Sequence, residues 1–183
     1  MSLGVKKKLS IVTCMDSRLM LSKMLGLDIG DAEVIRNAGG RVTPDVIRSL
    51  YVAQEVPELA TREVVIIHHT DCGAQAAERH VDLLVARAQQ LLGLLGPLLG
   101  LMQAAARTLV PEAVRRFALR TVARTFGDPV EAVRWDVAVL RAAPLMRRDI
   151  PIHGLLYDVK TGQLFHVLTS PPNTDPLRPW QHK

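Results

Sequence analysis

Short β-branched runs alternate with amphipathic stretches along the first half of the chain. Leu9–Cys14 is an apolar run that ends at the polar cluster Asp16–Arg18, which is typical of a strand buried on both faces. Val34–Ile35 predicts a second, shorter strand that leads into a glycine turn at Arg36–Gly40. Glu63–His69 contains four consecutive β-branched residues and is the strongest strand signal in the chain.

A helix is predicted between the second and third of these strands. Thr43, Pro44 and Asp45 supply an N-cap, a proline at the first helical position and an acid in the first turn. Its apolar stripe at helical spacing consists of Val46, Ile47, Leu50 and Ala53. Strands joined by such long crossovers pair in parallel, through right-handed connections.

The last third of the chain predicts one more helix and two strands. Asp128–Glu131 has the same cap and proline pattern, and the helix should run to about Arg141. Its inward positions are Val130, Val133, Val137 and Leu140. Ile152–Tyr157 and Leu164–Leu168 then read as strands joined by a hairpin-like turn. The predicted fold class is therefore α/β, with a mainly parallel sheet flanked by helices.

Two segments fall outside this pattern. Leu91–Met102 is a leucine-rich stretch within an uncharged run of 19 residues, but its Gln and Gly residues and Pro97 argue against a membrane span. A broken pair of apolar helices, packed in the core or against another subunit, is expected instead. We therefore predict one domain over 1–183, with a Leu-rich helical insert at about 74–127 and an irregular tail at 170–183. The exposed leucines would favour a homo-oligomer.

Composition narrows the class of protein. The 183 residues are 48% hydrophobic and 22% charged, as in a soluble globular domain. Seven Arg and three acidic residues between Ala74 and Gly127 account for most of the net charge of +5, so a solvated helix face is favoured over a nucleic-acid surface. Two Trp, two Tyr and three Phe are too few for a base-stacking platform. No nucleic-acid partner is expected.

The N-terminus and the cysteines bear on the cellular compartment. The first eight residues lack the apolar region and small-residue cleavage site of a signal peptide, which predicts a cytoplasmic protein. Cys14 and Cys72 lie 58 residues apart. In a reducing compartment, such a sparse pair favours a metal or catalytic site over a disulfide, and two unrelated buried thiols are the alternative.

Three residues at the predicted strand ends form a candidate metal site. Cys14 ends the first strand, His69 ends the strand that starts at Glu63, and Cys72 follows three residues later. The carboxyl ends of parallel strands meet at one edge of the sheet, where ligands collect. Two thiolates and one imidazole suit Zn²⁺, and three protein ligands leave a fourth position for water. A core histidine beside unrelated thiols is the alternative.

Three segments around these residues match a known family. Cys14–Arg18, Val34–Gly40 and His69–Gly73 resemble, in order and approximate spacing, the signature segments of the β-carbonic anhydrases. The resemblance covers about Leu9 to Gly73 and resumes more weakly near Asp128 to Leu168. It does not extend to the segment from 74 to 127.

The resemblance implies a ligand set and a reaction. Cys14, His69 and Cys72 would be the zinc ligands, Asp16 and Arg18 would be the catalytic dyad, and the reaction would be hydration of carbon dioxide to bicarbonate. Arg18 would hold Asp16 off the metal through a bidentate pair. An ordinary surface ion pair at a strand end is the alternative reading of these two residues.

Further residues near these motifs are weaker candidates. Gly73 would offer its backbone N–H to a substrate oxygen, and Asn37 with Gly39 and Gly40 would bring backbone close to the site. A plain tight turn is the alternative for Asn37 and Gly39. His68 should point to the opposite face of its strand from His69, in a core or supporting role, and Asp71 would accept a hydrogen bond within the turn.

Two other functions fit the same residues. Hydrolases of carbon disulfide or carbonyl sulfide resemble this family and use the same zinc ligands, and a leucine-rich insert would favour such apolar substrates. A non-catalytic zinc or scaffold protein, in which Asp16 fills the fourth metal position, is the second alternative. Arg18 counts against it.

Overall fold

The computed structural model describes residues 4–80, 83–84, 86–87 and 121–172. Contacts along the chain divide it into two compact units, residues 1–71 with 128–183 and residues 72–127. The second unit nearly coincides with the predicted insert at 74–127. The leucine-rich stretch Leu91–Met102 and most of the predicted tail lie outside the described residues.

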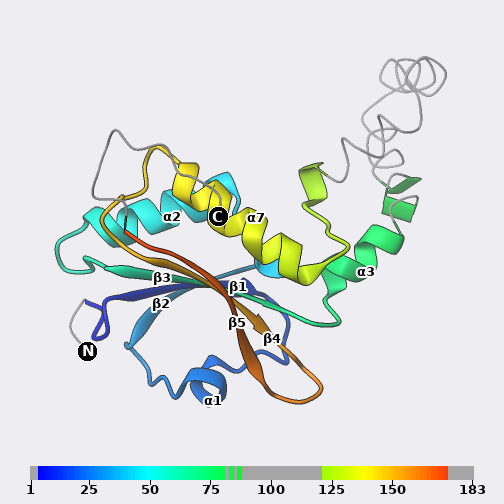
Figure 1. Cartoon of the computed structure of the whole chain (residues 1–183), viewed down its shortest axis with the longest axis horizontal. Helices are drawn as coiled ribbons and strands as arrows, with labels where there is room; N and C mark the ends of the chain where they lie inside the picture. The colour runs from blue at the N-terminus through cyan, green and yellow to red at the C-terminus, as the bar shows by residue number, and fades with distance from the viewer. Residues whose placement is uncertain (1–3, 81–82, 85, 88–120, 173–183) are drawn as a thin grey trace. The chain divides into compact units, whose positions relative to one another are not determined.

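Five strands form one sheet within the described residues, in the order β2-β1-β3-β4-β5 (Figure 1). They are β1 (Leu9–Cys14), β2 (Ala32–Asn37), β3 (Glu63–His69), β4 (Ile152–Tyr157) and β5 (Leu164–Ser170). The first four strands of the chain pair in parallel, and β5 runs antiparallel to β4. The predicted α/β fold with a mainly parallel sheet is confirmed.

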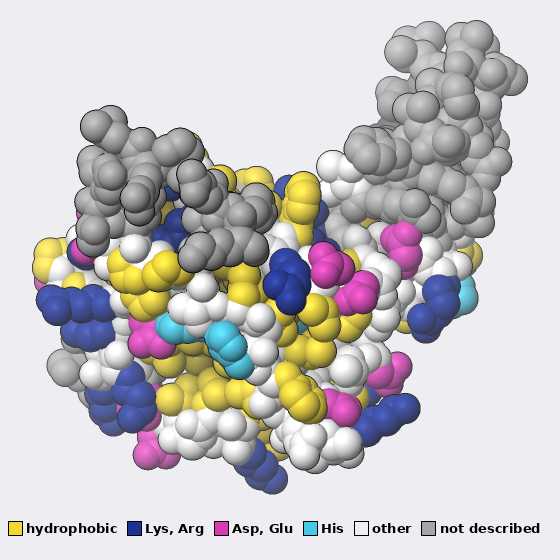
Figure 2. All heavy atoms as spheres, viewed as in Figure 1, with side chains coloured by type: hydrophobic (Ala, Val, Ile, Leu, Met, Phe, Trp, Pro, Cys, Tyr) yellow, Lys and Arg dark blue, Asp and Glu magenta, His cyan; other side chains and the backbone are white. Residues whose placement is uncertain are grey.

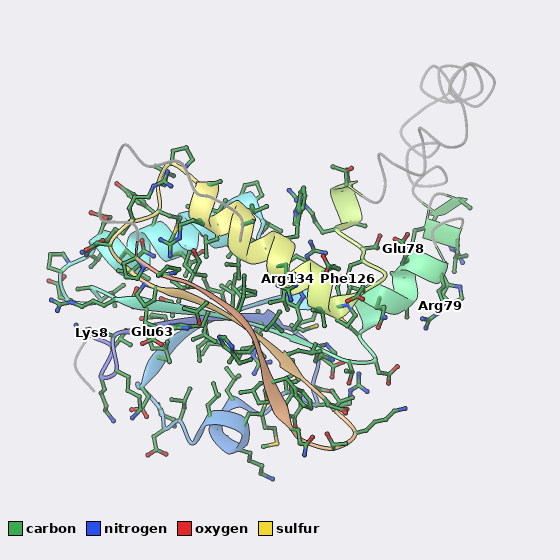
Figure 3. All side chains as sticks on the ribbon, in the orientation of Figure 1. Lys8, Glu63, Glu78, Arg79, Phe126 and Arg134 are labelled. Atoms are coloured by element: carbon green, nitrogen blue, oxygen red, sulfur yellow. The ribbon has the colours of Figure 1, made fainter. Side chains whose placement is uncertain are left out.

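The strand register brings the predicted metal ligands to one edge of the sheet. Leu9 of β1 pairs with Glu63 of β3, so both strands start at the same edge, where Lys8 and Glu63 are labelled in Figure 3. Both strands also end at the opposite edge, with Cys14 last in β1 and His69 last in β3. Parallel pairing therefore brings these two side chains close together.

Two predicted helices cover one face of the sheet (Figure 1). Helix α2 (Pro44–Glu55) starts after Thr43, whose side chain accepts a hydrogen bond from the amide of Val46. Helix α7 (Pro129–Ala142) starts after Asp128, whose carboxylate accepts from two amides of the first turn. The two caps confirm both predicted helix starts. Buried residues of both helices form one core with β1, β3 and β4.

The opposite face of the sheet carries a smaller apolar cluster around helix α1 (Leu21–Leu25). This helix was not predicted, because five residues are too short to show a helical period. Val34–Ile35 proved to be the middle of the longer strand β2, whose polar flanks mark a sheet edge.

Strand β5 extends to Ser170, two residues beyond the predicted strand and onto the first residue of the predicted tail. Ser170 is the last residue of β5, and it is buried. Its hydroxyl accepts a hydrogen bond from Nε of Arg141 at 2.9 Å, and its carbonyl accepts one from Nη2 at 2.9 Å. These bonds satisfy the hydroxyl and the carbonyl of Ser170, which would otherwise need water as a partner. The strand can therefore extend beyond its apolar run.

Gly154 allows α7 to pack closely on β4. A Cβ at this position would lie 2.5 Å from Cγ1 of Val133 and 2.8 Å from Cδ2 of Leu168. We expect Gly154→Ala to lower the free energy of unfolding by about 1–3 kcal/mol, since overpacked cores lose that much. Urea denaturation would measure it. Gly127→Ala is the control, because no described atom lies within 4 Å of its added methyl, and equal stability of the two variants would contradict the expectation.

Two further observations concern the distribution of surface charge and the possibility of a membrane-spanning helix. On the face seen in Figure 2, basic and acidic side chains are interspersed, and the coloured residues there show no continuous basic area. In the part of the chain that the structure describes, none of the helices has the length and apolar character required to cross a membrane.

Candidate metal centre

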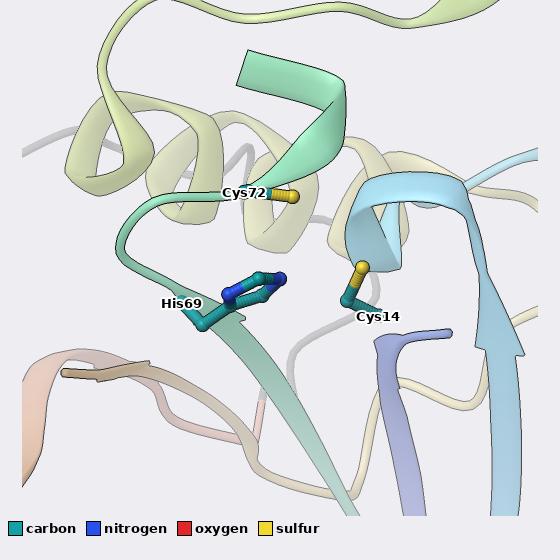
Figure 4. A group of neighbouring side chains, drawn as sticks. All are labelled: Cys14, His69 and Cys72. Atoms are coloured by element: carbon teal, nitrogen blue, oxygen red, sulfur yellow. The ribbon is translucent and has the colours of Figure 1, made fainter. Parts of the chain in front are cut away.

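Cys14, His69 and Cys72 come together as a buried cluster (Figure 4). Their candidate ligand atoms all lie within 4.8 Å of one another. Cys14 and His69 end two adjacent parallel strands, and Cys72 immediately precedes helix α3 (Gly73–Arg79). Both cysteines are free of disulfide bonds. The three side chains of the sequence prediction therefore meet at the predicted edge of the sheet.

The ring of His69 has one nitrogen available for a metal. Nδ1 lies 2.9 Å from the carbonyl oxygen of Thr70. Because a carbonyl only accepts hydrogen bonds, this contact places the ring proton on Nδ1 and leaves the lone pair on Nε2. Nε2 is buried and makes no hydrogen bond within the described residues. A buried nitrogen in this state, beside two thiols, fits Zn²⁺.

A glycine turn supports Cys14 from behind. The short helical turn Ala38–Gly40 follows β2, and a Cβ on Gly40 would lie 2.8 Å from the backbone nitrogen of Cys14. Gly40 also has φ +67°, in the left-handed region that favours glycine. The amide of Met15 donates to the carbonyl of Asn37 at 2.8 Å. Backbone therefore packs directly on this candidate ligand.

The candidate substrate-binding residues lie around the cluster in different settings. The side-chain amide of Asn37 donates to the carbonyl of Arg41 at 2.7 Å and accepts from its N–H at 2.8 Å, so it closes the turn. Gly39 is buried within the turn with φ +81°. Gly73 is the first residue of α3. A role for these three residues in substrate binding stays a prediction.

Asp16 and Arg18 form the bidentate pair that the sequence predicted. Nε of Arg18 donates to Oδ1 of Asp16 at 2.9 Å, and Nη2 donates to Oδ2 at 2.7 Å. The Arg18 side-chain hydrogen bonds hold the pKa of Asp16 well below its usual range. Oδ2 lies 3.8 Å from Nε2 of His69, so the carboxylate borders the cluster. Asp16 is therefore an anion held next to the candidate metal ligands.

Arg18 also binds the turn that carries two of the ligands. Its Nη1 lies 3.1 Å from Oδ2 of Asp71, and its Nη2 donates to the backbone carbonyl of Asp71 at 2.8 Å. Hydrogen bonds to Asp16, and to a smaller extent to Asp71, raise the pKa of Arg18 above its usual value. Asp71 has φ +54°, a strained conformation for a residue other than glycine. Arg18 thus links the end of β1 to the turn between His69 and Cys72.

A second polar contact holds this turn from the other side, and sequence reasoning missed it. The hydroxyl of Thr70 donates to Oδ1 of Asp158 at 3.2 Å and accepts from the amide of Val159 at 3.1 Å. The amide of Thr70 donates to the carbonyl of Tyr157 at 2.9 Å. The sequence did indicate a turn at Asp158. No local pattern shows that this turn contacts Thr70.

A mainly parallel sheet with a buried Cys-His-Cys cluster at its carboxyl edge defines an α/β protein with a candidate metal centre. The carbonic anhydrase family model matches residues 9–164. β-Carbonic anhydrase 1 of Mycobacterium tuberculosis is 37% identical over 161 residues, which are 88% of this chain and 82% of that protein. The carbon disulfide hydrolase of Acidithiobacillus thiooxidans is 30% identical over 167 residues, 90% of this chain and 79% of that protein.

A solved structure supports the same relationship. The carbonic anhydrase of Streptococcus mutans superposes with a TM-score of 0.65 at 40% identity, covering 92% of this chain and 86% of that one. The chain belongs to the β-carbonic anhydrase family. The family named from three short motifs of the sequence is therefore confirmed. The expectation that the resemblance stops at residues 74–127 was wrong, because the matched range 9–164 includes that segment.

Proposed function

We propose that the protein catalyses the zinc-dependent hydration of carbon dioxide to bicarbonate. The buried Cys14, His69 and Cys72 cluster, bordered by a carboxylate in a bidentate pair with arginine, supports the proposal most directly. These three residues would hold Zn²⁺ through two sulfur atoms and Nε2 of His69. When bound, Zn²⁺ supplies Lewis acidity that lowers the pKa of water toward neutrality.

Asp16 acts in this proposal as a hydrogen-bond acceptor beside the cluster. Its low pKa keeps it anionic at neutral pH, so it accepts a hydrogen bond from the attacking water and directs a lone pair of the water oxygen toward the substrate carbon. Arg18 occupies both carboxylate oxygens and keeps Asp16 from turning onto the metal. Asn37 and Gly39 would bring backbone close to the site, and the N–H of Gly73 would bind a substrate oxygen.

Hydrolysis of carbon disulfide or carbonyl sulfide is the second candidate function. The similarity to the carbon disulfide hydrolase of Acidithiobacillus thiooxidans favours it. Like carbon dioxide, both of these molecules are linear and have an electrophilic carbon between two heteroatoms. Asp16 and Arg18 would therefore serve hydration of carbon dioxide or hydrolysis of the sulfur compounds. A non-catalytic role would need Asp16 to act as a fourth ligand, and its hydrogen bonds to Arg18 oppose that movement.

A parallel assay would separate these functions. Purified zinc-loaded protein would be tested for carbon dioxide hydration by stopped-flow pH change and for sulfide release from carbon disulfide and carbonyl sulfide. We expect rapid hydration that disappears when a chelator removes the zinc. Sulfide release without hydration would establish the hydrolase instead, and absence of both activities in zinc-loaded protein would support the non-catalytic role.

We further propose that the protein acts in the cytoplasm as a homo-oligomer, a dimer or larger. The support is the leucine-rich composition of residues 91–102, whose apolar side chains would be costly to expose to water. Replacing both Leu95 and Leu99 with Glu is expected to break the assembly while zinc content stays unchanged. Sedimentation velocity would measure it, and a wild-type monomer of 20.2 kDa would contradict the proposal.

A further inference from the structure

A buried ionic cluster lies on the face of the sheet covered by α7, and the site described above does not include it. It consists of Arg41, His68 and Asp136, whose side chains are 7%, 0% and 1% exposed. Burying a carboxylate and a guanidinium costs free energy that pairing only partly returns, and well-packed apolar residues of similar size are often as stable. Stability alone therefore does not explain this cluster.

The carboxylate of Asp136 joins two segments that are distant in sequence. Its Oδ2 lies 2.7 Å from Nε of Arg41 and 3.0 Å from Nε2 of His68. Its Oδ1 accepts a hydrogen bond from the amide of Val42 at 3.2 Å. One side chain of α7 therefore holds both the residues after the glycine turn and the end of β3.

The first of these connections leads to His69. Side chains alternate along β3: Val64 and Ile66 pack in the core with α2 and α7, and Val65 and Ile67 pack on the α1 side. His68 lies on the face of the sheet that α2 and α7 cover, and His69 points to the opposite face. Fixing Nε2 of His68 against Asp136 therefore limits rotation of the strand end that carries His69.

The second connection leads to Cys14. Arg41 directly follows Gly40, whose α-carbon packs against the backbone of Cys14. The backbone of Arg41 also makes both hydrogen bonds of the Asn37 amide. The ion pair with Asp136 therefore keeps this turn seated against Cys14.

We propose that Asp136 is a positioning residue for the metal centre. It fixes the backbone behind Cys14 and the strand end at His69 relative to each other, so that two ligands are already placed before a metal binds. This inference rests on the proposed zinc site. An ion pair needed only for packing could lie anywhere in the core, whereas this one joins the two segments that carry these ligands.

The test is Asp136→Asn in the zinc-loaded protein. The amide has the same shape but no charge, so Arg41 loses its ionic partner and the turn loosens. We expect zinc release to a chromogenic chelator to be about tenfold faster, because residues that orient metal ligands typically contribute 10- to 100-fold in affinity. The visible bands of the Co²⁺-substituted protein should also change in position and intensity, which reports on ligand geometry rather than on fold.

Arg141→Met is the matched control on the same helix. Arg141 is buried and donates to the hydroxyl of Ser170 and the carbonyl of Ile150, outside the Asp136 cluster. It should lower the urea midpoint but leave zinc release and the Co²⁺ spectrum as in wild type. If both variants change zinc release equally, or if folded Asp136→Asn matches wild type, the inference is wrong.

The double variant Arg41→Met with Asp136→Leu covers the case in which the single variant does not fold. It removes the carboxylate and the guanidinium together, so neither is left buried without the other. We expect it to fold and to release zinc faster than wild type, and wild-type release would overturn the inference. A wild-type protein that binds no zinc would remove the proposed function along with this inference, which distinguishes the two failures.

Discussion

Cys72→Ala is expected to lose most of its zinc and its activity. The side chain is buried beside Cys14 and His69, with all three candidate ligand atoms within 4.8 Å of one another. Removing one of three ligands should weaken zinc binding by about 100-fold or more, since residues that merely orient a ligand already contribute about 10- to 100-fold. The variant should also be less stable, because metal binding is coupled to folding.

Zinc content measured by atomic absorption after dialysis checks this prediction. The wild type should retain about one zinc per chain, and Cys14→Ala should behave like Cys72→Ala. His166→Ala is the matched control, because this exposed histidine lies outside the cluster and should leave zinc content unchanged. Full occupancy in Cys72→Ala would show that the ligands have been assigned wrongly.

The strands and the candidate ligands could be predicted because their signals are local. Leu9–Cys14 and Glu63–His69 are β-branched runs whose bounds match β1 and β3. Parallel pairing then requires their carboxyl ends to meet, which places Cys14 beside His69 without any knowledge of side-chain contacts. Residue type and the position of the strand ends were therefore sufficient to predict most of the candidate metal centre.

The polar contacts around the site could not be predicted, because each joins residues far apart in sequence. Arg18 and Asp71 are 53 residues apart, and either would read locally as a solvated charge. Asp136 lies in α7 beside apolar positions, where a single acid indicates no partner. Only the folded chain shows that Arg41 and His68 converge on it. Local patterns identify which residues carry chemistry, and long-range packing decides how those residues are held.

Arg18→Ala is expected to keep its zinc and lose activity by about 100-fold, the scale on which misplacing a group that orients the reactants lowers the rate. Arg18 donates to both carboxylate oxygens of Asp16 and to the carbonyl of Asp71. Without these bonds, Asp16 is free to turn toward the cluster, since its Oδ2 already lies 3.8 Å from Nε2 of His69. The three candidate ligands are untouched, so the loss should appear in kcat rather than in zinc content.

Arg147→Ala provides the control for this prediction. Arg147 makes a similar bidentate pair with Asp149, also two residues away, and Nε donates to Oδ1 at 2.9 Å. Removing it eliminates an exposed ion pair of the same geometry that does not border the cluster, so activity should stay near wild type. Stopped-flow hydration assays on both zinc-loaded variants make the comparison. If Arg18→Ala retains activity within about twofold of Arg147→Ala, Arg18 and Asp16 form only a structural pair and the catalytic dyad must be abandoned.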